Sequence, residues 1–281
     1  MFTAKDALYQ AMAYTDKKVK GGGGGIIPVP LTITENGTYT AQVGQAYNPV
    51  TVNVPTYDNN SLLYITAVYP EDYNYDIVLT KDTVSSEDVY NLALILSSAY
   101  NLTIASRHIE NSAFDDKEIT NNLIFTDSID AVVGFSQCTI FGDVIFNSGV
   151  TVIGENAFYS SNLGNTSLVL PEGVTTIMDG AFSLCTLGYN SESEYHDYDG
   201  TIILPSTLES IGSSAFQISS YLNTVNLIIH AVTPPSLYSS DSISLPEGGK
   251  IYVPAESVDA YKSAEHWSEL ADIIEAIPTE S

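Results

Sequence analysis

Lysine and arginine are scarce in this chain: nine of its 281 residues are basic against 34 acidic ones, a formal net charge of -25. A polyanion of this kind repels phosphate groups, which excludes sequence-independent binding to nucleic acid or to an anionic membrane surface. Four of the nine basic residues are lysines within residues 1–20, where two aspartates accompany them. That segment therefore carries +2 and the remainder -27, so the two parts are chemically different.

Long apolar runs are also missing. Residues 1–19 hold no stretch of roughly 7 to 15 apolar residues, so the sequence predicts no secretory signal. No later segment approaches the roughly 18 consecutive apolar residues of a membrane span. We therefore expect no membrane insertion.

Catalytic and metal-binding motifs are absent as well. The sequence contains no GxSxG, HExxH, P-loop or GxGxxG pattern. The four histidines are scattered without metal-ligand spacing: His108, His196, His230 and His266. The sequence thus predicts no catalytic residue, no metal site and no cofactor, and the expected role is binding or structural.

What the chain does contain is a repeat in which an isoleucine is followed, after three residues, by Ala-Phe. It occurs four times, with the phenylalanines at Phe114, Phe158, Phe182 and Phe216. The stretch ending in Phe135 fills the first gap as a degenerate copy, so the phenylalanines step by 21, 23, 24 and 34 residues. Periods of about 20 to 29 residues are typical of leucine-rich-repeat solenoids.

Short apolar runs precede the repeats and are the expected strands of a parallel stack. They lie at 123–125, 144–146, 169–171 and 203–205, with further strands near 227–229 and 251–253. The two cysteines, Cys138 and Cys185, each follow a repeat phenylalanine by three residues. Equivalent positions two repeats apart are separated by about 10 Å, which exceeds the roughly 7 Å limit for a disulfide. The sequence therefore predicts two buried free thiols.

The segments before the repeats predict a modular N-terminal part. Residues 2–19 read as a helix whose apolar face includes the candidate attachment or oligomerisation residues Leu8, Ala11, Thr15 and Val19. Residues 21–28 form a glycine-rich linker. Residues 29–57 alternate apolar and polar residues around turn signals and predict a small β module. A frayed terminal helix is the alternative for the first segment.

Two caps are expected to close the solenoid. Residues 58–104 form the N-terminal cap, with strands at 62–69 and 75–80 and a helix from Ser86 to Tyr100. The repeats span 105–254 and the C-terminal cap 255–281. In that last segment Ser257 is the expected helix N-cap, and the face that covers the final repeat comprises Val258, Tyr261, Ala264, Trp267, Leu270 and Ile274.

The 34-residue step reflects an insertion at 188–200, rich in acidic and aromatic residues. Its candidate ligand-binding residues are Tyr189, Tyr195, His196, Asp197, Tyr198 and Asp199. Three readings remain open: a solvated acidic loop, a recognition loop of the kind that solenoids use for binding, and a calcium site that lacks the full EF-hand pattern. Tyrosine favours recognition, because its stiff ring offers contact area with a polar tip.

The pattern LPEGVTTIMDGAFSLC (170–185) and the tail IYVPAESVDAYKSAEHWSELADIIEAI (251–277) resemble BspA-like (Treponema-type) leucine-rich repeats. The resemblance implies a mainly β solenoid with short helices. It also implies a surface-exposed protein that binds other proteins or cell surfaces and is not an enzyme. The run TENGTYTAQVGQAYNPVTVNVP (34–55) is similar to a short module that recurs in virion proteins of phages.

These observations lead to one functional hypothesis and two alternatives. The leading one is a non-enzymatic phage virion protein, a fibre or appendage subunit. Residues 1–20 would contact other virion proteins, and the repeats would bind a bacterial surface protein or glycan; a homotrimer is possible, as in many phage fibres. The alternatives are a bacterial or prophage-encoded surface adhesin and a purely structural decoration protein. The missing secretory signal favours the virion, because lysis releases virion proteins.

Overall fold

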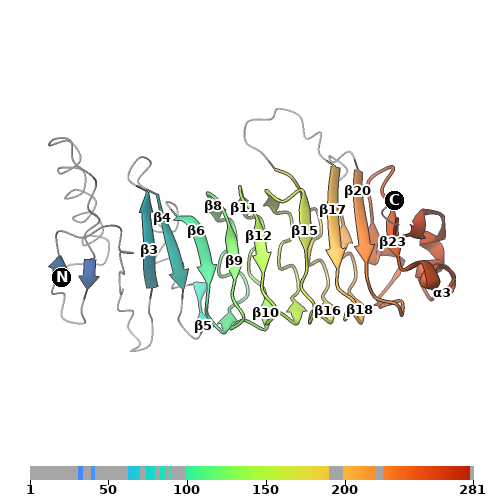
Figure 1. Cartoon of the computed structure of the whole chain (residues 1–281), viewed down its shortest axis with the longest axis horizontal. Coiled ribbons are helices and arrows are strands. Elements are labelled where there is room, and N and C mark those ends of the chain that lie inside the picture. Colours follow the sequence, from blue (N-terminus) through green and yellow to red (C-terminus); the bar gives the residue numbers. More distant parts are fainter. Residues whose placement is uncertain are drawn as a thin grey trace.

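The computed structural model describes residues 99–189, 199–218 and 224–278, and before them 31–33, 39–41, 63–69, 74–79, 83–86 and 89. Strands stack side by side along one axis into an elongated solenoid, and the helical turns around α3 (Val258–Ser263) lie at its C-terminal end (Figure 1). The predicted N-terminal helix and glycine linker fall outside the described residues. Most regular elements of the described ranges are short strands, which turns connect, as the repeat predicted.

Two five-stranded sheets follow each other along one face of the solenoid, in the orders β3-β4-β6-β9-β12 and β15-β17-β20-β23-β24. The first comprises β3 (Leu63–Tyr69), β4 (Asn74–Leu79), β6 (Ala99–Ile104), β9 (Leu123–Phe125) and β12 (Val144–Phe146). The second comprises β15 (Ser167–Val169), β17 (Asp199–Leu204), β20 (Thr224–Ile229), β23 (Ile251–Val253) and β24 (Ile274–Ala276). Neighbours pair in parallel, except for the antiparallel β3 and β4.

Three of the four repeat isoleucines, Ile153, Ile177 and Ile211, lie in another sheet, which we call the isoleucine sheet, whereas Ile109 lies in β7 (His108–Ile109). The isoleucine sheet runs β10 (Ala131–Val132), β13 (Val152–Ile153), β16 (Thr176–Ile177), β18 (Ser210–Ile211) and β21 (Ser236–Leu237). A further sheet contains β8 (Glu118–Ile119), β11 (Thr139–Ile140) and β14 (Asn162–Leu163). Shorter pairs are β1 (Leu31–Ile33) with β2 (Tyr39–Ala41), β5 (Thr83–Val84) with β7 (His108–Ile109), and β19 (Phe216–Gln217) with β22 (Ile243–Ser244).

The repeat phenylalanines form one buried column. The ring centroids of successive members lie 4.7 Å (Phe114 to Phe135), 5.7 Å (to Phe158), 5.5 Å (to Phe182) and 5.5 Å (to Phe216) apart, with nearly parallel planes. These separations follow the spacing of neighbouring strands, about 4.8 Å. The degenerate copy ending in Phe135 is therefore a genuine member of the stack, as the sequence predicted.

Both cysteines lie in this core as free thiols, which confirms the prediction. The Sγ of Cys138 donates to the carbonyl oxygen of Phe114 (3.0 Å), and the Sγ of Cys185 donates to that of Phe158 (2.7 Å). The two thiols thus occupy the same place in their repeats. Burial raises the pKa of each from 9.0 to about 12, because an apolar core disfavours the thiolate.

Each repeat turns sharply on either side of its phenylalanine. Two residues before it, left-handed backbone occurs at Ser112, Asn156, Gly180 and Ser214; two residues after it, at Asp116, Gln137, Ser160 and Leu184. Glycine and short polar residues tolerate this conformation best, because an L side chain clashes there with the following carbonyl. Leu184 (φ 58°) departs from that pattern.

The C-terminal cap closes the last repeat with two buried aromatic rings. The hydroxyl of Tyr261 donates to the carbonyl oxygen of Ala231 (2.8 Å), and the Nε1–H of Trp267 donates to that of Pro235 (2.7 Å). The predicted covering face is confirmed, although it is split between α3 and the 3-10 helix η3 (Trp267–Ile273). Ser257 is the N-cap residue of α3, as predicted, but its hydroxyl makes no capping hydrogen bond.

Four predicted boundaries were wrong. The helix expected over 86–100 does not reach its predicted end, because Ala99 and Tyr100 belong to β6; Ser86 and Val89 are helical. The strands expected at 169–171 and 203–205 lie at 167–169 and 199–204, since Pro171 and Pro205 cannot donate to a ladder. The insertion expected at 188–200 ends earlier, because Asp199 and Gly200 already belong to β17.

Candidate functional site

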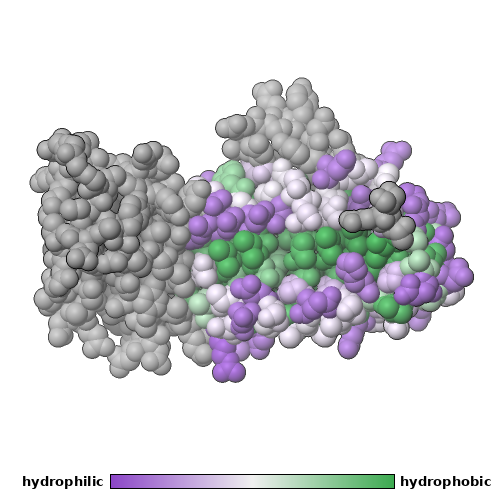
Figure 2. Space-filling model, viewed as in Figure 1, coloured by the Kyte–Doolittle hydropathy of each residue, from purple (hydrophilic) through white to green (hydrophobic). Residues whose placement is uncertain are grey.

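The candidate binding surface is a row of outward-facing apolar side chains along the long face. We call it the apolar row: Ile124, Ile145, Val169, Ile203, Ile228 and Tyr252. Each is the outward residue between two buried neighbours of its strand. Strand register places Ile124 beside Ile145, and it aligns Val169, Ile203, Ile228 and Tyr252 in turn. Figure 2 shows a continuous apolar band across this face, bordered by hydrophilic residues.

The centre of the apolar row is its most exposed part, because the sheet is interrupted there. In the preceding repeat the amide of Leu123 donates to the carbonyl oxygen of Asp143 (2.9 Å). At the equivalent place the amide of Val144 donates instead to the side chain of the buried Asn165 (Oδ1, 2.7 Å). The ladder between β12 and β15 is thereby replaced by a side-chain contact. Ile145 and Val169, on either side of it, are 39% and 51% exposed.

A polar rim borders the apolar row, two residues earlier in each strand. It consists of Asn122, Asp143, Ser167, Thr201, Asn226 and Lys250. Two of the asparagines are fixed by the backbone: Oδ1 of Asn122 accepts from the amide of Asp143 (2.8 Å), and Oδ1 of Asn226 from that of Lys250 (3.0 Å). The surface therefore combines an apolar centre with oriented polar groups at its edge.

The predicted recognition loop is only partly described. Tyr189 packs against Phe141 with a centroid distance of 5.7 Å, and its amide donates to the carbonyl oxygen of Leu163 (2.9 Å). Asp199 begins β17 and accepts a hydrogen bond from the hydroxyl of Thr224. The other four candidates lie outside the described residues: Tyr195, His196, Asp197 and Tyr198. The same holds for the N-terminal candidates Leu8, Ala11, Thr15 and Val19.

Sequence reasoning missed the apolar row. Its signal was visible, because the strands read LIF, VIF, LVL, IIL, LII and IYV, with three apolar residues in succession. A strand with one solvated face should alternate apolar and polar residues. The runs were predicted only as strands of a parallel stack; in the structure the middle residue of each triplet points outward.

Within the described ranges, no group of three or more histidine, cysteine, aspartate or glutamate side chains is placed to hold a metal ion. No helix of the described residues is long and apolar enough to cross a membrane. One exposed carboxylate is perturbed: hydrogen bonds from the amide and hydroxyl of Ser206 hold the pKa of Glu172 below its usual value. That contact joins two turns of neighbouring repeats and is structural.

Stacked parallel strands around a repeated buried phenylalanine column define a leucine-rich-repeat solenoid. The family model of the BspA type leucine rich repeat region matches in six copies over residues 97–194 and 195–240. These matches cover more than half of the chain, and the chain belongs to this family. A search of curated proteins finds no match. Repeats of this kind suggest a surface or protein-binding role.

Proposed function

We propose that this chain is a non-enzymatic binding protein whose apolar row docks a partner protein. The observation that carries the proposal is a row of six outward apolar side chains, two in register on the first sheet and four on the second, on a molecule with a net charge of -25. Isolated exposed apolar residues are normal, whereas contiguous ones with a polar rim are typical of interfaces. A solenoid also holds its surface rigid, so little conformational entropy is lost on binding.

The dimensions of the apolar row suit a protein partner. Six strands at a spacing of about 4.8 Å extend the row over roughly 24 Å. The face is the outer surface of a sheet, which suits a complementary protein surface better than a small molecule. Acidic partners are disfavoured by charge, so the partner is expected to be neutral or basic where it meets the rim.

In the proposed biological setting the chain is a fibre or appendage subunit of a phage particle. Residues 1–20 contact other virion proteins, either by docking on them as a single helix or by packing as a homotrimer. The repeats bind a protein or glycan on the bacterial surface. What supports this setting is the similarity of residues 34–55 to virion modules and the basic first segment, which differs in charge from the body.

Lysine substitutions in the apolar row test the docking surface. Ile145→Lys and Val169→Lys place a charge at its exposed centre, and we expect binding to host bacteria to weaken by at least about tenfold, or 1.4 kcal/mol. Tyr159→Lys is the matched control, because Tyr159 is also exposed (36%) but lies in a turn outside the long face. Equal binding by all three variants would contradict the proposal.

A second experiment separates the settings. Detection of the chain in purified particles, together with cell binding by residues 80–281, supports the virion receptor-binding role. Presence in particles without any cell binding would favour a decoration protein. Absence from particles, with cell binding retained, would favour a bacterial adhesin.

A further inference from the structure

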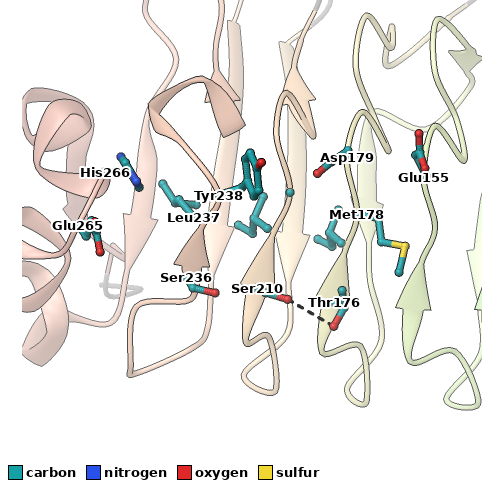
Figure 3. Close-up of a pocket in the computed structure, with 13 residues that line it drawn as sticks. Glu155, Thr176, Met178, Asp179, Ser210, Ser236, Leu237, Tyr238, Glu265 and His266 are labelled. Atoms are coloured by element: carbon teal, nitrogen blue, oxygen red, sulfur yellow. Dashed lines mark hydrogen bonds between the residues drawn. The ribbon is translucent and has the colours of Figure 1, made fainter.

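A groove of about 670 Å³ lies where the isoleucine sheet (β10, β13, β16, β18 and β21) meets the C-terminal cap. The apolar row lies on different sheets. Its floor crosses β16, β18 and β21, and Glu265 and His266 of the cap close one end (Figure 3). We propose that this groove binds a neutral oligosaccharide. The site is separate from the docking surface proposed above and does not depend on it.

An exposed aromatic ring dominates the groove. Tyr238 follows the buried Leu237 of β21 and is 73% exposed, the most exposed of the large apolar side chains described. The equivalent residue is Gly212 on the neighbouring strand and Met178 (44% exposed) on the next. Parallel strands lie about 4.8 Å apart, so about two strand spacings separate Tyr238 from Met178.

The Asp179 carboxylate occupies the place that a side chain of residue 212 would take. A Cβ added to Gly212 would lie 2.4 Å from Oδ1 of Asp179, 2.5 Å from its amide nitrogen and 2.6 Å from the carbonyl carbon of Met178. No side chain of residue 212 can therefore stand beside Tyr238, and a carboxylate lies there in its place. The exposed ring is available to a ligand that stacks on it and hydrogen-bonds to Asp179.

The two long edges of the groove carry polar groups in register. Thr176, Ser210 and Ser236 form a row of hydroxyls on adjacent strands, with Ser210 Oγ donating to Thr176 Oγ1 at 3.4 Å (Figure 3). On the other edge Asp179 is held by the amide of Ser213, which donates to Oδ1 at 2.8 Å. A polyhydroxylated ligand uses both kinds of group, since sugar hydroxyls donate and accept hydrogen bonds.

A peptide strand fits this groove less well. Of the floor strands, β16 and β18 are interior to their sheet and β21 is its edge strand. The amides of Gly212 and Tyr238 are already used, donating to Ile177 (2.8 Å) and Ile211 (3.0 Å). Strand addition needs an open sheet edge, so a peptide strand would pair along the outer edge of β21, whereas a ligand that lies across the groove is held by side chains. A sugar can use these side chains, because its ring can stack on the tyrosine and its hydroxyl groups can hydrogen-bond to the flanking hydroxyls and carboxylates.

Charge narrows the ligand class further. Three carboxylates line the groove, from Glu155, Asp179 and Glu265, and His266 is its single basic residue. Acidic sugars would be repelled by this lining and by the net charge of -25. The lining therefore excludes acidic sugars, and a neutral sugar can meet the three carboxylates through its hydroxyl groups.

The test is binding of the full chain to a panel of immobilised oligosaccharides that contains neutral, amino and acidic members. Neutral members should bind, Tyr238→Ala should weaken their binding by at least about tenfold, and Tyr238→Phe should retain it, because stacking is the main contact. Met178→Ala, a second exposed position, should weaken binding by a smaller factor. Tyr159→Ala is the control for an exposed tyrosine outside the groove.

Several outcomes would overturn the assignment. They are failure of every neutral sugar to bind, equal binding by wild type and Tyr238→Ala, or preferential binding of acidic sugars. Binding of a basic peptide in place of sugars, lost at high salt, would show an electrostatic surface and not a sugar site. Ile145→Lys should leave sugar binding unchanged, so failure of the docking surface and failure of this groove are distinguishable.

Discussion

Leu184 occupies a turn position at which the preceding repeats place Asp116, Gln137 and Ser160, all in left-handed backbone. A leucine there is strained by its Cβ, and it gains little from burial because it is 42% exposed. We expect Leu184→Asn to raise the free energy of unfolding by about 0.5 to 1 kcal/mol. Urea denaturation measures this.

Leu184→Ala is the matched control for that prediction, because it removes the exposed side chain but keeps a Cβ in left-handed backbone. It should not stabilise the protein. If Asn and Ala give the same urea midpoint, backbone strain at this turn is not the cause.

Because of the two buried thiols, the free energy of unfolding should fall as the pH rises through the alkaline range. Burial raises their pKa to about 12, whereas an unfolded cysteine ionises near pH 8.5 to 9. Between these values the folded state binds more protons, so stability is complete below pH 9 and falls as the pH rises. Each thiol should lower the free energy of unfolding by about 1.4 kcal/mol per pH unit in that window.

Urea melts of wild type and the double variant Cys138→Ala/Cys185→Ala, from pH 8 to 10.5, measure this effect. The variant starts less stable, because two core atoms are lost, but its stability should decline with a shallower slope. Tyr261, whose pKa burial also raises, is present in both proteins and cancels in the comparison. Parallel slopes would contradict the assignment to the thiols.

At the scale of elements, the C-terminal cap is held by two hydrogen bonds from aromatic side chains. Trp267→Phe keeps most of the buried ring but removes the donor to the carbonyl oxygen of Pro235. A buried carbonyl left without its donor costs about 1 to 3 kcal/mol. We expect a loss of that size in urea, followed by circular dichroism because Trp267 is the single tryptophan.

Tyr261→Phe is the companion variant, since it removes only the hydroxyl that donates to Ala231. If the cap acts as one unit, the double variant should lose less than the sum of the two single losses. If these two hydrogen bonds contribute nothing to stability, both single variants should unfold at the same urea midpoint as the wild type.

The elements that the sequence predicted best are those fixed by the repeat itself. The strands at 123–125 and 144–146 were placed to the residue, because spacing from the repeat phenylalanine is nearly constant. The helix from Ser86 was extended too far, since Ala99 and Tyr100 suit a helix locally while pairing with β4 draws them into the sheet. Local propensity is overridden by such tertiary pairing.

The candidate site was harder to predict than the fold for a physical reason. Hydrophobic patterns predict which residues are buried in the core. Ile145 and Val169 are apolar residues of the kind found in cores, yet their side chains are exposed to solvent. The groove beside Tyr238 depends on Gly212 and on the cap residue His266, which are 54 residues apart. Only the stacking of repeats and the position of the cap bring them together.

At the scale of the whole molecule, the residues that hold the fold together differ from those that are proposed to bind partners. The phenylalanine column and the aligned turns give every repeat the same frame, so binding properties depend on the outward residue of each strand. The apolar row and the sugar groove lie on different sheets of that frame. A partner on the long face would therefore leave the groove beside Tyr238 accessible.

Net charge gives the last prediction. In the described part of the chain a lysine or arginine pairs with a carboxylate once, Lys250 with Glu275 at 2.7 Å. Most of the 34 acidic residues therefore repel one another without compensation. Raising the salt concentration shortens the screening length from about 30 Å at 0.01 M to about 8 Å at 0.15 M. Repulsion in the compact state weakens, so the melting temperature at pH 7 should rise by a few degrees, roughly 2 to 4 °C.

Calorimetry in sodium chloride at the two concentrations measures this shift, and it must be distinguished from general salt effects on apolar burial. Those effects depend on the kind of salt and appear at high concentration, whereas screening depends on ionic strength alone. Sodium chloride and sodium sulfate at equal, low ionic strength should therefore give the same rise. A melting temperature that does not change with salt would mean that the acidic side chains lie too far apart on the solenoid to repel, and the charge argument against acidic partners would lose its physical basis.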